Sequence, residues 1–226
     1  MGNPFTGAAA TSSLVTMTEF TLSLDPLRSR LVSGGYGRVI LVANNPAIGA
    51  AAAAALALTP ADVLVQFNKA TGFSLFAEIM CHKVHVLNAN GDGGYWGFGP
   101  EGQPEPDVRA QAHSELTVYF TRWLSEAAKT YLASLAPPVL GGVMGGQWEA
   151  SPYPYPAQHL PSAGFMAANY YRAVNFLRLF LGRKPLPLVL LGFTGSYPPG
   201  QGWKQHDFAY EQAVYQTLTD VTQLQA

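Results

Sequence analysis

Four short, largely apolar segments constrain the fold of this chain more than any other feature. The clearest is Arg38-Val-Ile-Leu-Val-Ala43, whose four central residues are all aliphatic. An unbroken apolar run of this length is typical of a strand that is buried on both faces, as in a parallel sheet. Segments 62–67, 83–87 and 186–193 predict three further strands. We expect all four to be neighbours in one sheet.

Helix patterns separate these predicted strands. They cover residues 47–58, 107–135, 162–181 and 207–218, and Thr59-Pro60 ends the first of them. Strands that alternate with helices are joined by right-handed crossovers and form parallel sheets. We therefore predict an α/β fold, a single Rossmann-like domain with a mostly parallel sheet and helices on both faces.

The remaining segments carry weaker signals. Residues 88–107 are rich in Gly, Pro and Asn and predict a loop over the site, and residues 145–160 contain three prolines, which exclude regular structure throughout. Residues 137–140 predict a further strand. We expect residues 1–33 to be a partly disordered N-terminal extension and residues 34–226 to be one domain.

Composition excludes several classes of function. Only 12% of the residues are charged, the net charge is −1, and no Lys/Arg cluster is present, so we expect no nucleic-acid binding. The longest apolar run, 47–58, is shorter than the roughly 20 residues that span a bilayer, so we expect no membrane span. The chain has one cysteine, Cys81, which excludes an internal disulfide and is compatible with a cytoplasmic location.

The first turn with chemical potential follows the first predicted strand, at Asn44 and Asn45. A strand-to-helix turn presents backbone N–H groups and the positive end of a helix, which suit an anion. We expect Asn45 to adopt the positive φ usually given to Gly. The alternative is an ordinary turn capped by Asn, and the G-x-G-x-x-G pattern of dinucleotide sites is absent here.

Further candidates lie at the end of the second strand and at the start of the 162–181 helix. Asn68 ends the second strand and is a candidate for nucleotide binding, the alternative being a turn residue. Ser162 and Gly164 open the helix. Ser162 is expected either to cap its own helix or, with the free N–H groups, to hold a ribose, phosphate or carboxylate.

The last candidates surround a Pro/Gly-rich loop near the C-terminal helix. His206 follows this loop and suits a general base because the pKa of a histidine lies near neutrality; the alternative is an ordinary surface histidine. Tyr197, in the loop, is a candidate for binding a leaving phosphate, or else packs on proline. Glu211 is expected to orient the loop or bind a backbone group rather than pair directly with His206.

Two segments of the sequence resemble metal-binding motifs, but each lacks ligands that its motif requires. Residues 88–93 resemble the start of a calcium loop, but Gly99 stands where the final Glu is required. Cys81, His82 and His85 resemble half a zinc site without a second pair at usable spacing, and the two histidines would point to opposite faces of a strand. We expect no metal site and no cofactor.

Taken in order, these segments resemble sialyltransferases of glycosyltransferase families 29 and 42. Those enzymes have a Gly-Asn-Gly or Gly-Asn-Ser turn after the first strand and a second strand that ends in Asn, here Asn44 and Gln66-Phe-Asn68. Their Pro-Ser-Thr-Gly segment is similar to Pro161-Ser-Ala-Gly164, and their later Gly-Phe strand end is similar to Val189-Leu-Leu-Gly-Phe193. Their His-x4-Glu segment corresponds to His206 and Glu211. The chain departs from them at Ala43, Asn45 and Ala163, and it lacks their paired cysteines.

The resemblance implies that residues 34–226 form a nucleotide-sugar-binding domain. It implies a metal-independent, inverting glycosyltransferase that moves a sugar from a CMP-linked donor to the hydroxyl of a glycan or small-molecule acceptor, with His206 as general base. Asn44, Asn45, Asn68, Ser162, Gly164, Tyr197 and Glu211 would then bind the substrates. The alternative is a non-catalytic nucleotide-binding or protein-interaction module on the same fold. The sequence does not indicate an oligomeric state.

Overall fold

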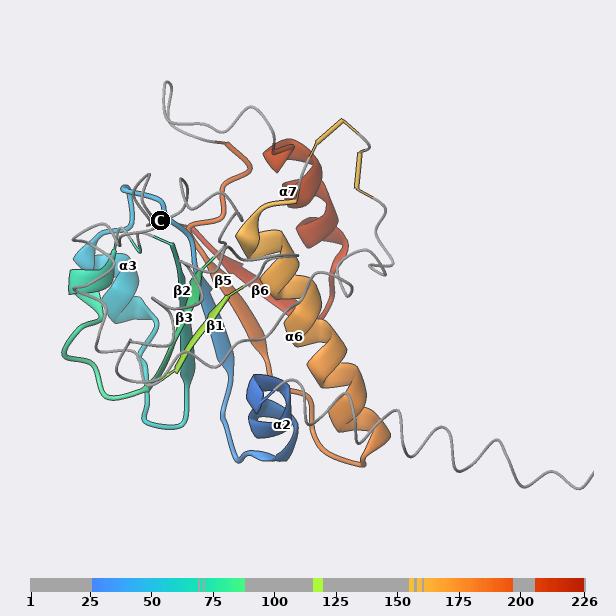
Figure 1. Cartoon of the computed structure of the whole chain (residues 1–226). Coiled ribbons are helices and arrows are strands. Elements are labelled where there is room, and N and C mark those ends of the chain that lie inside the picture. The colour runs from blue at the N-terminus through green and yellow to red at the C-terminus, as the bar shows by residue number, and fades with distance from the viewer. Residues whose placement is uncertain are drawn as a thin grey trace, which may run out of the picture.

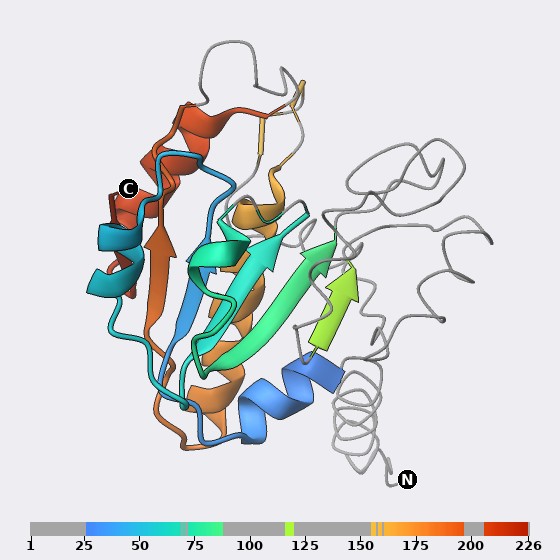
Figure 2. The same ribbon diagram turned by 90° about the vertical axis from the view of Figure 1, so that its left-hand side faces the viewer.

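The computed structural model describes residues 26–68, 70, 72–87, 116–119, 155–156, 158–159, 161–196 and 206–225. Six strands in these residues form one sheet: β1 (Val39–Val42), β2 (Val63–Phe67), β3 (His82–Leu87), β4 (Leu116–Tyr119), β5 (Leu188–Leu191) and β6 (Val221–Leu224). The order is β4-β3-β2-β1-β5-β6, and every neighbouring pair is parallel (Figure 2). The predicted α/β fold is confirmed, and the four predicted strands are neighbours.

Helices cover both faces of this sheet (Figure 1). They are α2 (Pro26–Ser33), α3 (Ala50–Ala55), α6 (Ala163–Phe180) and α7 (Phe208–Thr217), with the short 3₁₀ helix η1 (Phe73–Leu75). Buried residues of α2, α6 and α7 belong to one core cluster, and buried residues of α3 belong to the other. The sheet is therefore the middle layer of three.

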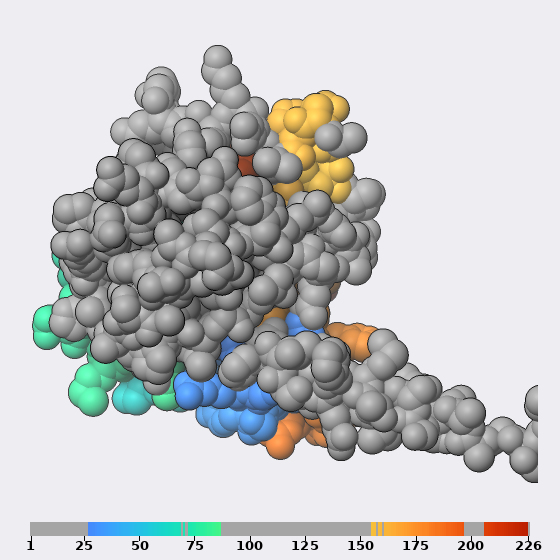
Figure 3. Space-filling model, in the orientation of Figure 1, coloured from blue at the N-terminus to red at the C-terminus, as the bar shows by residue number. Residues whose placement is uncertain are grey.

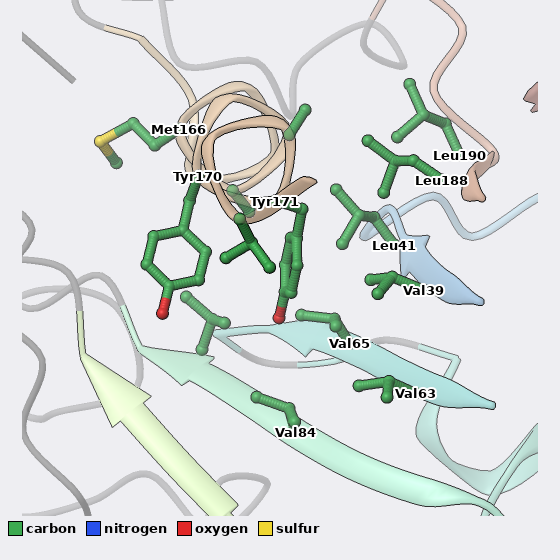
Figure 4. Close-up of a cluster of buried hydrophobic side chains, with 14 of the residues drawn as sticks. Val39, Leu41, Val63, Val65, Val84, Met166, Tyr170, Tyr171, Leu188 and Leu190 are labelled. Atoms are coloured by element: carbon green, nitrogen blue, oxygen red, sulfur yellow. The ribbon is translucent and has the colours of Figure 1, made fainter. Parts of the chain in front are cut away.

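The two clusters arise from the alternation of side chains along the strands. Val39 and Leu41 of β1 point towards α6, whereas Ile40 and Val42 point towards α3. All four residues are buried, which explains why the segment is apolar without interruption. Figure 4 shows the α6 side, where Tyr170 and Tyr171 pack over valines and leucines of β1, β2, β3 and β5.

The long helix α6 has clear signals at both ends. The Ser162 hydroxyl accepts a hydrogen bond from the Phe165 N–H at 3.1 Å and caps the first turn. The helix ends before Gly182, which adopts a φ of 70°, a conformation that glycine takes without strain. The Arg183 N–H then donates to the Arg178 carbonyl at 2.7 Å and satisfies part of the last turn.

The predicted helix over 107–135 is wrong where the structure describes it, because Leu116–Tyr119 forms strand β4. The interpretation rested on apolar residues at helical spacing. Within the four residues, however, Leu116 and Val118 also alternate with Thr117 and Tyr119, and pairing with β3 decides the outcome. The rest of that prediction, the predicted loop at 88–107 and the predicted strand at 137–140 lie outside the described residues.

Other boundaries also differ from the expectation. Helix α3 covers only Ala50–Ala55, because residues before it form a turn. Strand β6 was not predicted; its four residues are polar or half-buried at the sheet edge. Helix α2 lies in the segment expected to be an extension, yet its Leu27 and Leu31 are buried in the α6-side core. The packed core thus begins before Gly34.

The strand order creates one position at which the chain reverses direction across the sheet. From β1 the chain proceeds to β2, β3 and β4 on one side, and it then returns to β5 on the other side of β1. In open α/β sheets, ligands bind at the carboxyl ends of the strands beside such a switch point. A ligand site is therefore expected at the carboxyl ends of β1 and β5.

Candidate functional site

A pocket lies at this switch point, between the carboxyl ends of β1, β2 and β5 and the facing ends of α6 and α7. The pocket has a volume of about 110 Å³, which is room for several waters or for part of a larger polar ligand. Its lining includes residues predicted from four separate segments: Asn44, Asn45, Asn68, Ser162, Gly164, His206 and Glu211. The expected convergence of these segments is confirmed. Tyr197 lies outside the described residues.

The first wall of the pocket is the turn after β1. The Asn44 side-chain amide donates to the Phe67 carbonyl at 2.9 Å, and the Asn45 amide donates to the Gly192 carbonyl at 3.0 Å. The Asn45 Oδ1 accepts from the Ala47 N–H at 2.9 Å. These amides join the ends of β1, β2 and β5, so both side chains shape the rim of the pocket.

Asn68 forms the next wall and carries backbone strain. The positive φ expected at Asn45 occurs instead at Asn68, where φ is 48°. Its N–H donates to the Val86 carbonyl at 2.9 Å, and its own carbonyl accepts from Nε2 of His85 at 2.7 Å. These bonds from β3 hold Asn68 in the left-handed conformation, which Asn tolerates better than most residues.

His85 was considered only as a metal ligand in the sequence, and the structure gives it a different position. It is buried on β3, and burial lowers its pKa to about 4. A carbonyl accepts its Nε2 hydrogen bond, so the neutral ring carries its proton on Nε2. His85 thus supports the end of β2 beneath the pocket. In the sequence, His85 is simply one residue of an alternating strand pattern, and nothing in that pattern indicates that it supports Asn68.

A buried carboxylate ties α7 to the start of α6. Glu211 is 2% exposed, and its Oε1 accepts from the Ser162 N–H at 2.7 Å and from the Tyr155 hydroxyl at 2.8 Å. Its Oε2 accepts from the Ser162 hydroxyl at 2.6 Å. The expectation that Glu211 binds a backbone group is met, and Ser162 uses its hydroxyl both to cap α6 and to bind Glu211.

This cluster shifts the pKa values of its members. Burial raises the pKa of Glu211 above its usual value, although the hydrogen bonds from Ser162 and Tyr155 oppose the shift. Burial, reinforced by the charge of Glu211, raises the pKa of the Tyr155 hydroxyl far above its usual value. Tyr155 is therefore a neutral donor to Glu211 at any physiological pH.

His206 borders the pocket at the beginning of α7. Its ring packs edge-on against Phe208, with 5.4 Å between ring centroids. The following residue, Asp207, caps α7 by accepting from the Tyr210 N–H at 2.9 Å, and its own N–H donates to the Tyr155 hydroxyl at 2.9 Å. The backbone beside His206 is thus fixed to the Glu211 cluster.

Gly164 provides close packing at the wall of the pocket. A Cβ placed on it would lie 2.3 Å from Cε1 of Phe193, a distance that the phenyl ring does not allow without moving. The residue predicted to bind a substrate therefore permits α6 to approach the end of β5.

Two polar atoms in the lining lack partners among the described residues. Tyr215 is 3% exposed, and its hydroxyl forms no hydrogen bond; the Oε1 of Gln212 is also unpaired. Buried polar groups nearly always have partners. These atoms are therefore available to a ligand or to ordered water. Sequence reasoning missed them, because a Tyr and a Gln in a helix are common core and surface residues.

The charges of the lining limit its chemistry. The described lining contains no Lys or Arg and one carboxylate, Glu211. An anionic group would therefore be held by backbone N–H groups, by the N-terminus of α6 and by His206. The described residues contain no group of three His, Cys, Asp or Glu side chains that would hold a metal ion.

Comparison with known proteins identifies no relative of this chain. No protein-family model, curated protein or solved structure matches the chain. Within the part of the chain that the structure describes, no helix has the length and hydropathy needed to cross a membrane.

Proposed function

We propose that this protein is a sialyltransferase-like glycosyltransferase, which transfers a sugar from a nucleotide-linked donor, by resemblance a CMP-linked one, to an acceptor hydroxyl. The observation that carries the proposal is the single pocket at the switch point of the sheet. It gathers His206, Asn68 and the start of α6, which are the segments that resemble those enzymes. Residues that follow neighbouring parallel strands meet at this edge in any such fold, so their convergence supports a ligand site, and the resemblance of the residues themselves supports the proposed chemistry.

The reaction proposed is one displacement with inversion. The acceptor oxygen attacks the anomeric carbon, the bond from that carbon to the phosphate oxygen breaks, and the acceptor proton passes to the imidazole of His206. The phosphate leaves with the bonding electron pair. Its developing charge would be met by the first N–H groups of α6, at Ala163 and Gly164, which have no intrahelical acceptor.

Glu211 acts in this proposal as a positioning residue. Its oxygens are taken by Ser162 and Tyr155, so it has no role in accepting the acceptor proton. It fixes α7 against α6, and α7 begins two residues after His206. Loss of Glu211 would displace the base from the helix end that receives the phosphate.

The test combines ligand binding with turnover. A thermal-shift panel of CMP, CDP, UMP, UDP and NAD identifies the nucleotide, because a ligand at a hundredfold excess over its Kd stabilises by about 2.7 kcal/mol. CMP is expected to give the largest shift. Transfer and hydrolysis of CMP-sugars are then measured with wild type and His206→Ala at saturating acceptor. The variant is expected to lose about 10²–10⁴-fold in kcat with little change in CMP affinity.

A matched control is His82→Ala. His82 lies at the first residue of β3, where it packs edge-on against Tyr36, and it does not line the pocket. Its substitution is expected to leave turnover intact. If wild type binds CMP but neither transfers nor hydrolyses a CMP-sugar, the non-catalytic nucleotide-binding module replaces this proposal. If no nucleotide shifts the melting temperature, the glycosyltransferase proposal and the nucleotide-binding alternative are both overturned.

A further inference from the structure

The end of α6 farthest from the pocket presents a cluster of exposed apolar side chains. Five large hydrophobic side chains are exposed among the described residues, and four belong to this end: Phe176 (70% exposed), Leu179 (58%), Phe180 (80%) and Leu181 (55%). Phe176, Leu179 and Phe180 are spaced i, i+3, i+4 and so lie on one side of the helix. Exposed apolar side chains that gather in one place mark an interaction surface more often than scattered ones do.

The surroundings of this apolar cluster are positively charged. Arg183 and Lys184 follow it after Gly182 and are exposed, and Arg30 on the neighbouring helix α2 is exposed as well. The sequence has no Asp or Glu in residues 26–37 or 163–206. The chain as a whole has a net charge of −1, so this concentration of positive charge is a local property.

Hydrogen bonds join the charged and apolar parts into one rigid surface. Arg178 is buried and donates through Nη1 to the carbonyl of Leu31 at 2.6 Å, and Arg183 Nη1 donates to the Ser33 carbonyl at 2.6 Å. Helix α2 is thereby fixed beside the end of α6. Figures 1 and 3 show the two segments side by side at the lower edge of the molecule.

Two acids on the described parts of the chain are paired with other arginines. Arg172, one turn earlier on α6, binds Asp220 at 3.1 Å, and Asp62 binds Arg38 at 3.0 Å. The positive charge of Arg30, Arg183 and Lys184 is therefore not neutralised by these acids. Two copies of the surface would repel each other through these cations, which disfavours a symmetric dimer across it.

We propose that this surface docks on an anionic lipid membrane. Phe and Leu side chains on one side of a helix, flanked by Lys and Arg, match the composition of segments that lie in the membrane interface. Phe176, Phe180 and Leu181 enter the boundary between headgroups and acyl chains, and Arg183 and Lys184 contact the headgroups. The inference is independent of the proposed glycosyltransferase activity.

The position of α6 determines what such docking does to the pocket. The helix has 18 residues and is about 27 Å long, with the pocket at its first residue and the docking surface at its last turn. Contact at the last turn leaves the pocket facing the aqueous side. The protein would then be concentrated at a membrane while its site stays open to solvent.

The test is co-sedimentation of the full chain with vesicles. Vesicles of phosphatidylcholine with about one third phosphatidylserine are expected to bind wild type, and binding is expected to fall with added salt. Vesicles of phosphatidylcholine alone are expected to bind at least about tenfold more weakly. The double variants Phe176→Ser/Phe180→Ser and Arg183→Glu/Lys184→Glu are each expected to lose about tenfold or more in affinity for the anionic vesicles.

Met80→Ser is the matched control, because Met80 is the fifth exposed hydrophobic side chain, 79% exposed, and lies on a different segment. It is expected to bind like wild type. The proposal is overturned if wild type ignores anionic vesicles, or if the Phe176→Ser/Phe180→Ser variant binds them equally well. If wild type instead forms a dimer that this variant abolishes, as measured by analytical ultracentrifugation, the surface joins two copies and the membrane proposal fails.

Discussion

The hydroxyls of Tyr155 and Tyr215, two tyrosines of the site, differ in their hydrogen bonding. The Tyr155 hydroxyl donates to Glu211 at 2.8 Å and accepts from the Asp207 N–H at 2.9 Å, whereas the buried Tyr215 hydroxyl has no partner among the described residues. Removing a hydroxyl that forms hydrogen bonds leaves its buried partners unpaired, which lowers the free energy of unfolding. Removing a hydroxyl that has no partner leaves no other group unpaired. The same substitution should therefore have different effects at the two positions.

We predict that Tyr155→Phe lowers the free energy of unfolding by about 1–3 kcal/mol, whereas Tyr215→Phe leaves it unchanged or raises it. Urea denaturation of the ligand-free protein measures both. If the Tyr215 hydroxyl serves a ligand, Tyr215→Phe should also weaken the stabilisation by CMP. A Tyr215→Phe variant that is destabilised as much as Tyr155→Phe would show that its hydroxyl has a partner in the folded protein.

We predict that the buried His85 makes the free energy of unfolding depend on pH. The pKa of His85 is about 4 in the folded protein, compared with an ordinary value of 6.5. Between these two pH values the histidine is protonated in the unfolded chain but neutral in the folded one. The stabilising contribution of the neutral ring is complete above about pH 6.5 and is lost as the pH falls towards 4. The loss amounts to about 3 kcal/mol, since one pKa unit corresponds to about 1.4 kcal/mol.

The variant His85→Gln tests this account, because a glutamine amide can donate to the Asn68 carbonyl but does not titrate. Unfolding free energies measured at pH 7 and pH 4.5 should differ less in the variant than in wild type. An equal difference in both proteins would assign the acid sensitivity to another group.

At the scale of elements, the contact between α6 and α7 depends on one carboxylate. Glu211 lies on α7, and Ser162, which caps α6, gives it both its N–H and its hydroxyl. We predict that Ser162→Ala lowers the free energy of unfolding by about 2–3 kcal/mol, because it removes the cap of α6 and also the hydroxyl that donates to the buried Glu211. Glu211→Ala is expected to lower it by about 3 kcal/mol because it leaves buried donors unpaired.

The double variant is the decisive measurement for this contact. The two side chains share a hydrogen bond of 2.6 Å, so the combined loss should be smaller than the sum of the single losses by about 1 kcal/mol. Strict additivity would mean that the two helix ends are not coupled through this bond.

The elements also show how far sequence reasoning reaches. The buried strands β1, β2 and β5 were predictable because both of their faces are covered, which favours largely apolar segments. β6 lies at the sheet edge with polar, half-buried residues, and β4 is a four-residue segment inside a helix-like pattern. For these strands the structure depends on pairing with a distant neighbour, which local periodicity does not contain.

The site was predictable to a similar extent. Residues that follow parallel strands must meet at one edge of the sheet, so the convergence of Asn44 and Asn68 follows from the strand pattern. The link from Tyr155 to Glu211 joins residues 56 positions apart, and no spacing rule indicates it. The support of Asn68 by His85 was hidden for the same reason.

At the scale of the whole molecule, the structure has two ends with different properties. The carboxyl ends of the strands carry a pocket without Lys or Arg in its described lining. Near the opposite end, the last turn of α6 and helix α2 expose apolar and positively charged side chains. A pocket directed away from the charged surface would allow ligand binding and surface attachment to operate independently.

The central claim is that the pocket at the switch point binds a nucleotide. Hydrogen–deuterium exchange of the full chain with and without saturating CMP tests it most directly. The account predicts slower amide exchange in the turn at Asn44–Ile48, in the first turn of α6 and around His206, with no change in α2. Unchanged exchange in all three pocket segments, or protection confined to other parts of the chain, would contradict it.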